Sequence, residues 1–177
     1  MNIAVLAWGS LFWDKRGLNI VNDWTNGGVV LPIEFARISS DGRLTLVITE
    51  EYGTNVETYW AISKYSELER AIENLQIREG TNKKGIGFVD LNSGKTQSKL
   101  SKALLGQIST WAQEKSLDAV IWTDLQSNFS ERQGKEFSYE NAEKYLKSLS
   151  GNAKIKADEY ITKAPKLTMT KLRKRIN

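Results

Sequence analysis

The chain has 177 residues, of which 40% are hydrophobic and 26% are charged, and its formal net charge is +4. This composition excludes disordered and fibrous proteins, and no run of 18 apolar residues is present to span a membrane. The sequence contains neither cysteine nor histidine, which excludes thiol nucleophiles, disulfides, thiolate metal sites and the usual general base of serine hydrolases.

Any enzyme chemistry must therefore use Asp, Glu, Lys or Tyr for proton transfer. We expect no cofactor and no metal site, because no acidic cluster has the spacing of metal ligands. The length predicts a single domain over residues 1–177. The N-terminus lacks the basic region and apolar core of a secretion signal, so we expect a cytoplasmic protein. The sequence does not indicate an oligomeric state.

The first hydrophobic run, residues 2–7, predicts a short buried strand. It ends at Trp8-Gly9-Ser10-Leu11, where glycine lets the backbone take a positive φ or lie close against another group. Backbone N–H groups beyond a strand end have no partner in the sheet and can face an anion. This loop is thus a candidate binding loop, with an ordinary turn as the alternative. A long, turn-rich segment follows, and it includes Trp13 and Trp24.

A β-hairpin is predicted next, with strands over residues 32–39 and 43–49 and Gly42 in the left-handed conformation. Glu34 and Arg37 differ in parity along the first strand, so they are predicted to face opposite sides of the sheet. A further strand is predicted over residues 56–62.

Ser66 and Glu69 have the spacing of a capping box and predict the start of a helix, which ends near Arg78 with Gly80 beyond its last turn. Glu79 is then a carboxylate at the negative end of the helix dipole, an unfavourable place. A salt bridge with Arg78 or exposure in a turn would explain it. Alternatively, its pKa is raised and it acts as a base or acid.

The second half of the chain predicts a strand over 85–91, a helix from Leu100 to before Ser116, a strand over 118–123, a polar loop over 124–135 and a helix opened by Ser138. Residues 154–177 carry eight Lys or Arg and two Asp or Glu, a local charge of +6, which leaves −2 for residues 1–153. We interpret this basic segment as a solvated C-terminal helix. Nucleic-acid binding is the alternative, but no aromatic and basic strand pattern supports it.

Three features together resemble the γ-glutamylcyclotransferase-like family. They are Trp8-Gly9-Ser10-Leu11-Phe12-Trp13 after the first strand, the hairpin over 35–46, and Arg78-Glu79-Gly80 at the end of a helix. The first motif is nearest to the Tyr-Gly-Ser-Leu-x-Trp form of the glutathione-directed branch. The similarity covers roughly residues 3–90. Trp8 stands where the family usually has Tyr, and Gln76 stands where it usually has Asp.

The resemblance implies an α+β fold with a compact mixed β-barrel flanked by helices. It implies the cyclisation of a γ-glutamyl group to 5-oxoproline with release of an amine or amino acid, and hence a small γ-glutamyl substrate. It assigns proton transfer to Glu79 and charge pairing to Arg37 and Arg78, and it assigns the binding of the carboxylate or developing oxyanion to the loop Trp8, Gly9, Ser10 and Leu11. The alternative is a non-catalytic small-molecule binding or regulatory module on the same fold.

Overall fold

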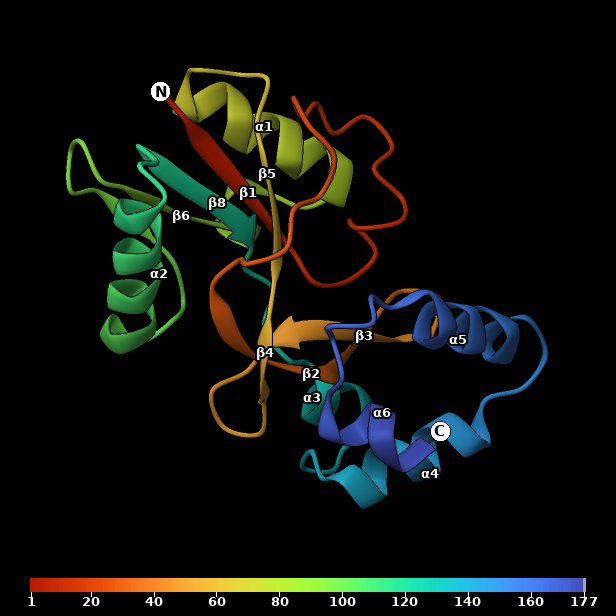
Figure 1. Ribbon diagram of the computed structural model, residues 1–177. Helices are drawn as coiled ribbons and strands as arrows, with labels where there is room; N and C mark the ends of the chain where they lie inside the picture. Colours follow the sequence, from red (N-terminus) through yellow and green to blue (C-terminus); the bar gives the residue numbers. More distant parts are fainter. Residues whose placement is uncertain (177) are drawn as a thin grey trace. The chain divides into compact units, whose positions relative to one another are not determined.

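The computed structural model describes residues 1–176, which form two compact units (Figure 1). Unit 1 consists of residues 1–7, 14–30 and 57–125. Unit 2 consists of residues 8–13, 31–56 and the chain from 126 onward. Each unit is therefore built from segments that are distant in the sequence, and the chain crosses between the units several times.

Unit 1 contains a five-stranded sheet in the order β5-β1-β8-β6-β7, in which β1 and β8 are parallel and the other pairs are antiparallel. Two helices and a 3₁₀ turn accompany the sheet, and both helices contact β6 and β8. All five residues of β1 are buried, as expected for a strand that is covered on both faces. The elements are β1 (Ile3–Ala7), β5 (Tyr59–Ile62), α1 (Leu68–Glu79), η1 (Lys83–Gly85), β6 (Ile86–Asp90), β7 (Thr96–Gln97), α2 (Lys102–Glu114) and β8 (Ala119–Thr123).

Unit 2 contains a three-stranded sheet in the order β3-β2-β4, and the chain after residue 125 adds the remaining helices of the described residues. The strands β2 and β3 form the predicted hairpin, and Gly42 in its turn has a φ of +87°, as expected. The elements are β2 (Val30–Ile38), β3 (Leu44–Ile48), β4 (Thr54–Glu57), α3 (Phe129–Gln133), α4 (Tyr139–Ser148), α5 (Gly151–Lys163) and α6 (Lys171–Ile176).

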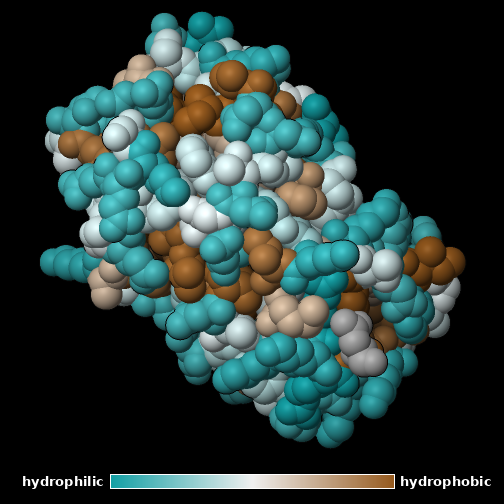
Figure 2. Space-filling model, in the orientation of Figure 1, coloured by the Kyte–Doolittle hydropathy of each residue, from teal (hydrophilic) through white to brown (hydrophobic). Residues whose placement is uncertain are grey.

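The α+β class predicted from the sequence is confirmed. Both sheets have a linear strand order with two edge strands, and no closed barrel is found among residues 1–176. The surface in Figure 2 is largely hydrophilic around small apolar patches. Within the described chain, no helix has the combination of length and apolar composition that crossing a membrane requires.

The predicted start of helix α1 is wrong. The helix begins at Leu68, its N-cap residue is Glu67, and the Glu67 side chain makes no capping hydrogen bond. Ser66 instead offers its carbonyl oxygen to the N-terminal ammonium of Met1, at 3.1 Å. The helix therefore begins one residue later than the capping-box spacing of Ser66 and Glu69 requires. The other end of the helix is as predicted, because Gly80 has a φ of +62°.

The strand predicted over residues 56–62 is divided at Thr58 into β4 and β5, which belong to different sheets. Thr58 is fully buried, and its hydroxyl donates to the Val29 carbonyl oxygen at 2.8 Å. The polar loop predicted over 124–135 also contains a helix, α3, whose first residue Phe129 is buried. In both places tertiary packing overrides the local pattern.

The parity prediction for Glu34 and Arg37 is also wrong, because β2 contains an irregularity between Phe35 and Arg37. Glu34 pairs with Val47 and Arg37 pairs with Thr45, and these partners are two residues apart on β3. An extra residue in one strand shifts the alternation of faces beyond it. The two side chains therefore fall on the same face by register.

Most cations of the basic C-terminal segment are exposed, as expected, but one face of its last helix, α6, is buried. In α6, Leu172 is fully buried and Arg173 is nearly so. The Arg173 guanidinium donates to the carbonyl oxygens of Ala164, Pro165 and Thr168. Buried charge is acceptable only with such partners. Part of the positive charge of this segment is thus used to hold the fold of unit 2.

Buried Glu34 anchors the same segment from the sheet. Its carboxylate accepts the backbone N–H of Leu172 at 3.3 Å and the Thr54 hydroxyl at 3.4 Å. The Lys171 N–H in turn donates to the Thr54 hydroxyl at 2.9 Å. Burial raises the pKa of Glu34, although hydrogen bonds from Thr170, Phe35, Leu172 and Thr54 act to lower it.

Candidate functional site

The first half of the candidate site is the loop from Trp8 to Trp13, which lies in unit 2. We call this loop, together with the residues of unit 2 that contact it, the Gly9 corner. Trp8 is buried, and its carbonyl oxygen accepts the Thr168 hydroxyl at 3.0 Å. The Phe12 N–H donates to the Gly9 carbonyl oxygen at 3.0 Å and closes a turn. Leu11 is also buried. The loop therefore has a defined shape, anchored by side chains as well as by its own backbone.

Gly9 has no positive φ, so conformational freedom is not the reason for a glycine here. The reason is space: a Cβ on Gly9 would lie 2.8 Å from the Tyr160 hydroxyl oxygen, closer than real Cβ contacts. Of the two uses of glycine that the sequence left open, close approach to another group is the one that the structure shows.

Tyr160, on α5, is the main contact of this corner that the sequence did not predict. Its ring meets those of Trp13 and Phe35 edge-on, with centroids 5.1 and 6.2 Å away. The Arg43 guanidinium lies 5.5 Å from the ring centroid. The only signal in the sequence was the helical spacing of three residues, Ala157, Tyr160 and Ala164. All three are buried in the structure. That spacing indicates burial but names no partner.

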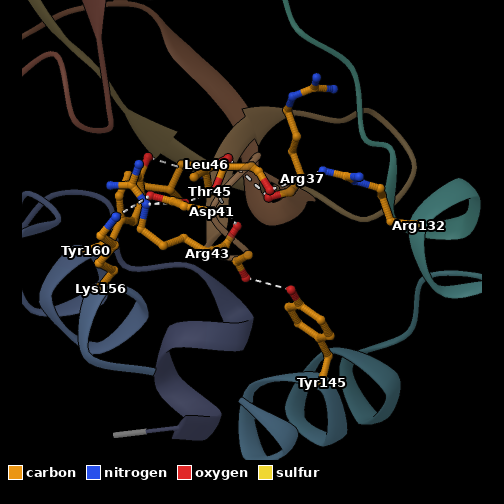
Figure 3. A network of polar contacts seen from close by, with 11 residues as sticks. Arg37, Asp41, Arg43, Thr45, Leu46, Arg132, Tyr145, Lys156 and Tyr160 are labelled. Atoms are coloured by element: carbon orange, nitrogen blue, oxygen red, sulfur yellow. Dashed lines mark hydrogen bonds and ion pairs between the residues drawn. The ribbon is translucent and has the colours of Figure 1, made fainter. Parts of the chain in front are cut away.

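A polar network joins the β2–β3 hairpin to α4 and α5 (Figure 3). Asp41 accepts from the Arg43 Nε at 2.9 Å and lies 3.5 Å from the Lys156 Nζ. The Tyr145 hydroxyl donates to the Gly42 carbonyl oxygen at 2.6 Å. Partial burial acts to raise the pKa of Asp41, but hydrogen bonds from Ser39 and Arg43 lower it to about 2. Arg43, which covers the Tyr160 ring, is thus fixed by a carboxylate that stays ionised.

Arg37, a predicted charge partner, is half-buried and donates from Nη1 to the Gln126 carbonyl oxygen at 2.7 Å. Figure 3 shows its guanidinium directed away from Asp41, Arg43 and Tyr160. Burial lowers the pKa of Arg37, and nearby Arg132 lowers it further, while Glu131 raises it. The structure thus gives the Arg37 guanidinium a backbone partner, whereas the Arg37 carbonyl oxygen accepts the Thr45 hydroxyl at 3.1 Å within the network of Figure 3.

The second half of the candidate site lies in unit 1 and consists of Arg78, Glu79 and the Asp14 carbonyl; we call it the Glu79 corner. Glu79 is the last residue of α1, and its side chain is 14% exposed. Its Oε1 lies 2.6 Å from the Arg78 Nη1, and the Arg78 side chain is only 1% exposed. Arg78 also donates from Nε and Nη2 to the Asp14 carbonyl oxygen. The salt bridge considered from the sequence is therefore present, and it is partly buried.

The Glu79 corner lies towards the carboxyl end of β8. Thr81, two residues beyond Glu79, packs against Gly85, and the Gly85 carbonyl oxygen accepts the N–H of Asp124, which follows β8. Because β1 runs parallel to β8, it ends at the same edge of the sheet. The chain leaves unit 1 after Ala7 and returns at Asp14, the residue whose carbonyl Arg78 holds.

No family model, curated protein or solved structure matches this chain. The assignment of chemistry therefore depends on the residues themselves. Within residues 1–176, no three acidic side chains come together as potential metal ligands. Asp124, a buried carboxylate that the sequence did not single out, accepts the Lys99 N–H at 2.7 Å and the Ser98 hydroxyl at 3.1 Å. It fastens the 98–99 segment to the sheet.

The two corners supply different chemistry. The Glu79 corner offers a carboxylate that can exchange protons, held by a buried guanidinium. The Gly9 corner offers backbone N–H groups of a loop whose position is fixed by aromatic packing, which is the kind of donor that stabilises an anion.

Proposed function

We propose that this chain is a γ-glutamylcyclotransferase-like enzyme that converts a γ-glutamyl compound into 5-oxoproline and a free amine or amino acid. The observation that carries the proposal is the Arg78 side chain. It pairs with Glu79 and also holds the carbonyl of Asp14, where the chain emerges from the Trp8–Trp13 loop. One buried guanidinium thus holds both the proposed proton carrier and Asp14, the residue that follows the proposed binding loop in the sequence. The mixed β-barrel implied by the family resemblance is part of this proposal.

In the proposed reaction, the Glu79 carboxylate takes a proton from the α-ammonium group of the substrate. The freed amine attacks the γ-carbonyl carbon, and a new C–N bond closes the five-membered ring. Backbone N–H groups of Gly9, Ser10 and Leu11 stabilise the tetrahedral oxyanion. The bond to the leaving nitrogen then breaks as Glu79 returns its proton to that nitrogen. The ring nitrogen still carries two hydrogens at this stage, and it loses one of them to the released amine or to solvent, so charge and protons balance.

This chemistry suits a chain without cysteine or histidine, because the nucleophile belongs to the substrate. Ring closure is intramolecular, so much of the entropic cost of bringing the reacting groups together is already met. The protein has to supply one proton carrier and a set of anion-binding donors. In this proposal Arg37 is a charge partner for the substrate.

The test is to incubate the protein with γ-glutamyl dipeptides, γ-glutamylamines and glutathione, and to measure 5-oxoproline by chromatography. We expect product from at least one of these three classes, and the productive class identifies the leaving group. If none yields 5-oxoproline while calorimetry still detects binding of one of them, the chain is a binding module and the enzymatic proposal is wrong.

A further inference from the structure

The contact between Gly9 and Tyr160 leaves no room for a side chain at position 9 of the candidate binding loop. A Cβ at position 9 would meet the Tyr160 hydroxyl oxygen at 2.8 Å, whereas its next neighbours would be Leu46 atoms at 3.7 and 3.9 Å, ordinary contact distances. The hydroxyl oxygen alone therefore occupies the space that a side chain at position 9 would need.

The Tyr160 hydroxyl cannot easily move aside. The side chain is 95% buried, and its ring is confined by Trp13 and Phe35. The Leu46 N–H donates to the hydroxyl oxygen at 3.4 Å. Closely packed interiors of this kind resist displacement of even one group. The oxygen is thus a fixed point against which the Gly9 backbone rests.

We infer that Tyr160 is a positioning residue whose hydroxyl sets the conformation of the Gly9-Ser10-Leu11 backbone, and so the direction of its N–H groups. The effect on catalysis rests on the proposed function, but the effect on the loop does not. Tyr160 need not contact the substrate. It acts through the loop, since small misplacements of anion-stabilising donors cost large factors in rate.

The test is a cycle of Gly9→Ala, Tyr160→Phe and the double variant. Gly9→Ala places a methyl group against the hydroxyl and lowers the midpoint of thermal unfolding. Tyr160→Phe removes the oxygen and leaves a gap, so amide exchange of residues 9–11 becomes faster. The double variant puts the methyl group into the space left by the oxygen, because the nearest remaining atoms are those of Leu46. We therefore expect it to be more stable than Gly9→Ala alone.

The kcat for 5-oxoproline formation is a further measurement, and it would not change if Tyr160 had a purely structural role. We expect Tyr160→Phe to lower kcat about tenfold with KM within about twofold of its original value, because donors are misdirected while the binding pocket is kept. Tyr145→Phe is the matched control, since this phenol also has a hydrogen bond to a backbone group of unit 2, but its partner is the Gly42 carbonyl of the hairpin turn. It should leave kcat and the exchange of residues 9–11 unchanged.

The inference is wrong if the double variant is no more stable than Gly9→Ala, or if Tyr160→Phe exchanges at residues 9–11 like the unmodified protein. It is equally wrong in its catalytic part if Tyr160→Phe and Tyr145→Phe have the same kcat. If the unmodified protein makes no 5-oxoproline, the proposed function fails, while the stability and exchange measurements still decide the role of Tyr160.

Discussion

The Gly9 corner and the Glu79 corner are fixed by opposite means. In the Glu79 corner, charge determines the geometry: a buried guanidinium holds the carboxylate of the next residue and a backbone carbonyl. In the Gly9 corner, shape determines it: a neutral hydroxyl and aromatic rings confine a backbone that has no side chain at the contact. The comparison indicates that the Glu79 carboxylate is held by directional ionic contacts, whereas the backbone of the Trp8–Trp13 loop is held by packing.

The two corners also differ in the sequence separation of the residues that contact one another in them. Arg78 and Glu79 are adjacent, and Arg78 reaches Asp14 over 64 residues. The Gly9 corner uses Thr168, which is 160 residues from Trp8, and Tyr160, which is 114 residues from Leu46. A charged pair can thus be suspected from neighbouring residues, whereas a steric contact depends on the whole fold. Four experiments test this contrast, beginning with the largest expected effect.

Glu79→Gln keeps the shape of the side chain but removes its ability to carry a proton. We expect kcat for 5-oxoproline formation to fall by about 10²- to 10⁴-fold, the usual contribution of a general acid–base group. The matched control is Glu73→Gln, an exposed glutamate on the same helix, which should leave turnover unchanged. Turnover that survives Glu79→Gln undiminished would show that another group is the base.

Arg78→Met removes the charge that organises the Glu79 corner. We expect a loss of about 3 kcal/mol in the free energy of unfolding, because hydrogen bonds from a buried guanidinium to Glu79 and Asp14 disappear together. Urea titration measures the change. Arg70→Met breaks an exposed pair with Glu67 on the same helix and should cost less than about 1 kcal/mol. Equal losses in the two variants would mean that burial does not distinguish Arg78.

Asp41→Asn tests whether charge also contributes to the Gly9 corner, through Arg43 above the Tyr160 ring. The pKa of Asp41 falls from 3.8 to about 2 in the folded chain, so its stabilisation is present above pH 3.8 and is lost as the pH falls towards 2. We expect the substitution to cost about 1–2 kcal/mol at pH 7 and almost nothing at pH 2. Urea titrations of both proteins at several pH values measure this difference, and a cost independent of pH would contradict it.

Glu34→Gln has the smallest expected effect. Its effect on the free energy of unfolding should change with pH in the direction opposite to that of Asp41→Asn. Because burial raises the pKa of Glu34 above 4.5, its contribution favours the fold below pH 4.5 and is lost as the pH rises through the raised pKa. The stability of the unmodified protein relative to the variant should therefore decline between acid and neutral pH. A difference that grows with pH would show that the hydrogen bonds to Glu34 outweigh its burial.

Local features of the fold were predictable because neighbouring residues determine them. Gly42 and Gly80 take the left-handed conformations that a hairpin turn and a helix end require, and the Ser138 side chain caps α4 by accepting the Asn141 N–H. The departures came where distant segments meet, as at Thr58, which divides a predicted strand between two sheets.

The sequence by itself determined the α+β class, the strand that leads into Trp8-Gly9-Ser10-Leu11, and the position of Glu79 at the end of a helix, because each follows from short-range periodicity and capping. Only the tertiary structure decided why residue 9 is glycine, which phenol lies against it, and that Arg78 joins Glu79 to the chain at Asp14. These are contacts between residues far apart in the chain. Their partners are set by packing of the whole fold, which no local pattern encodes.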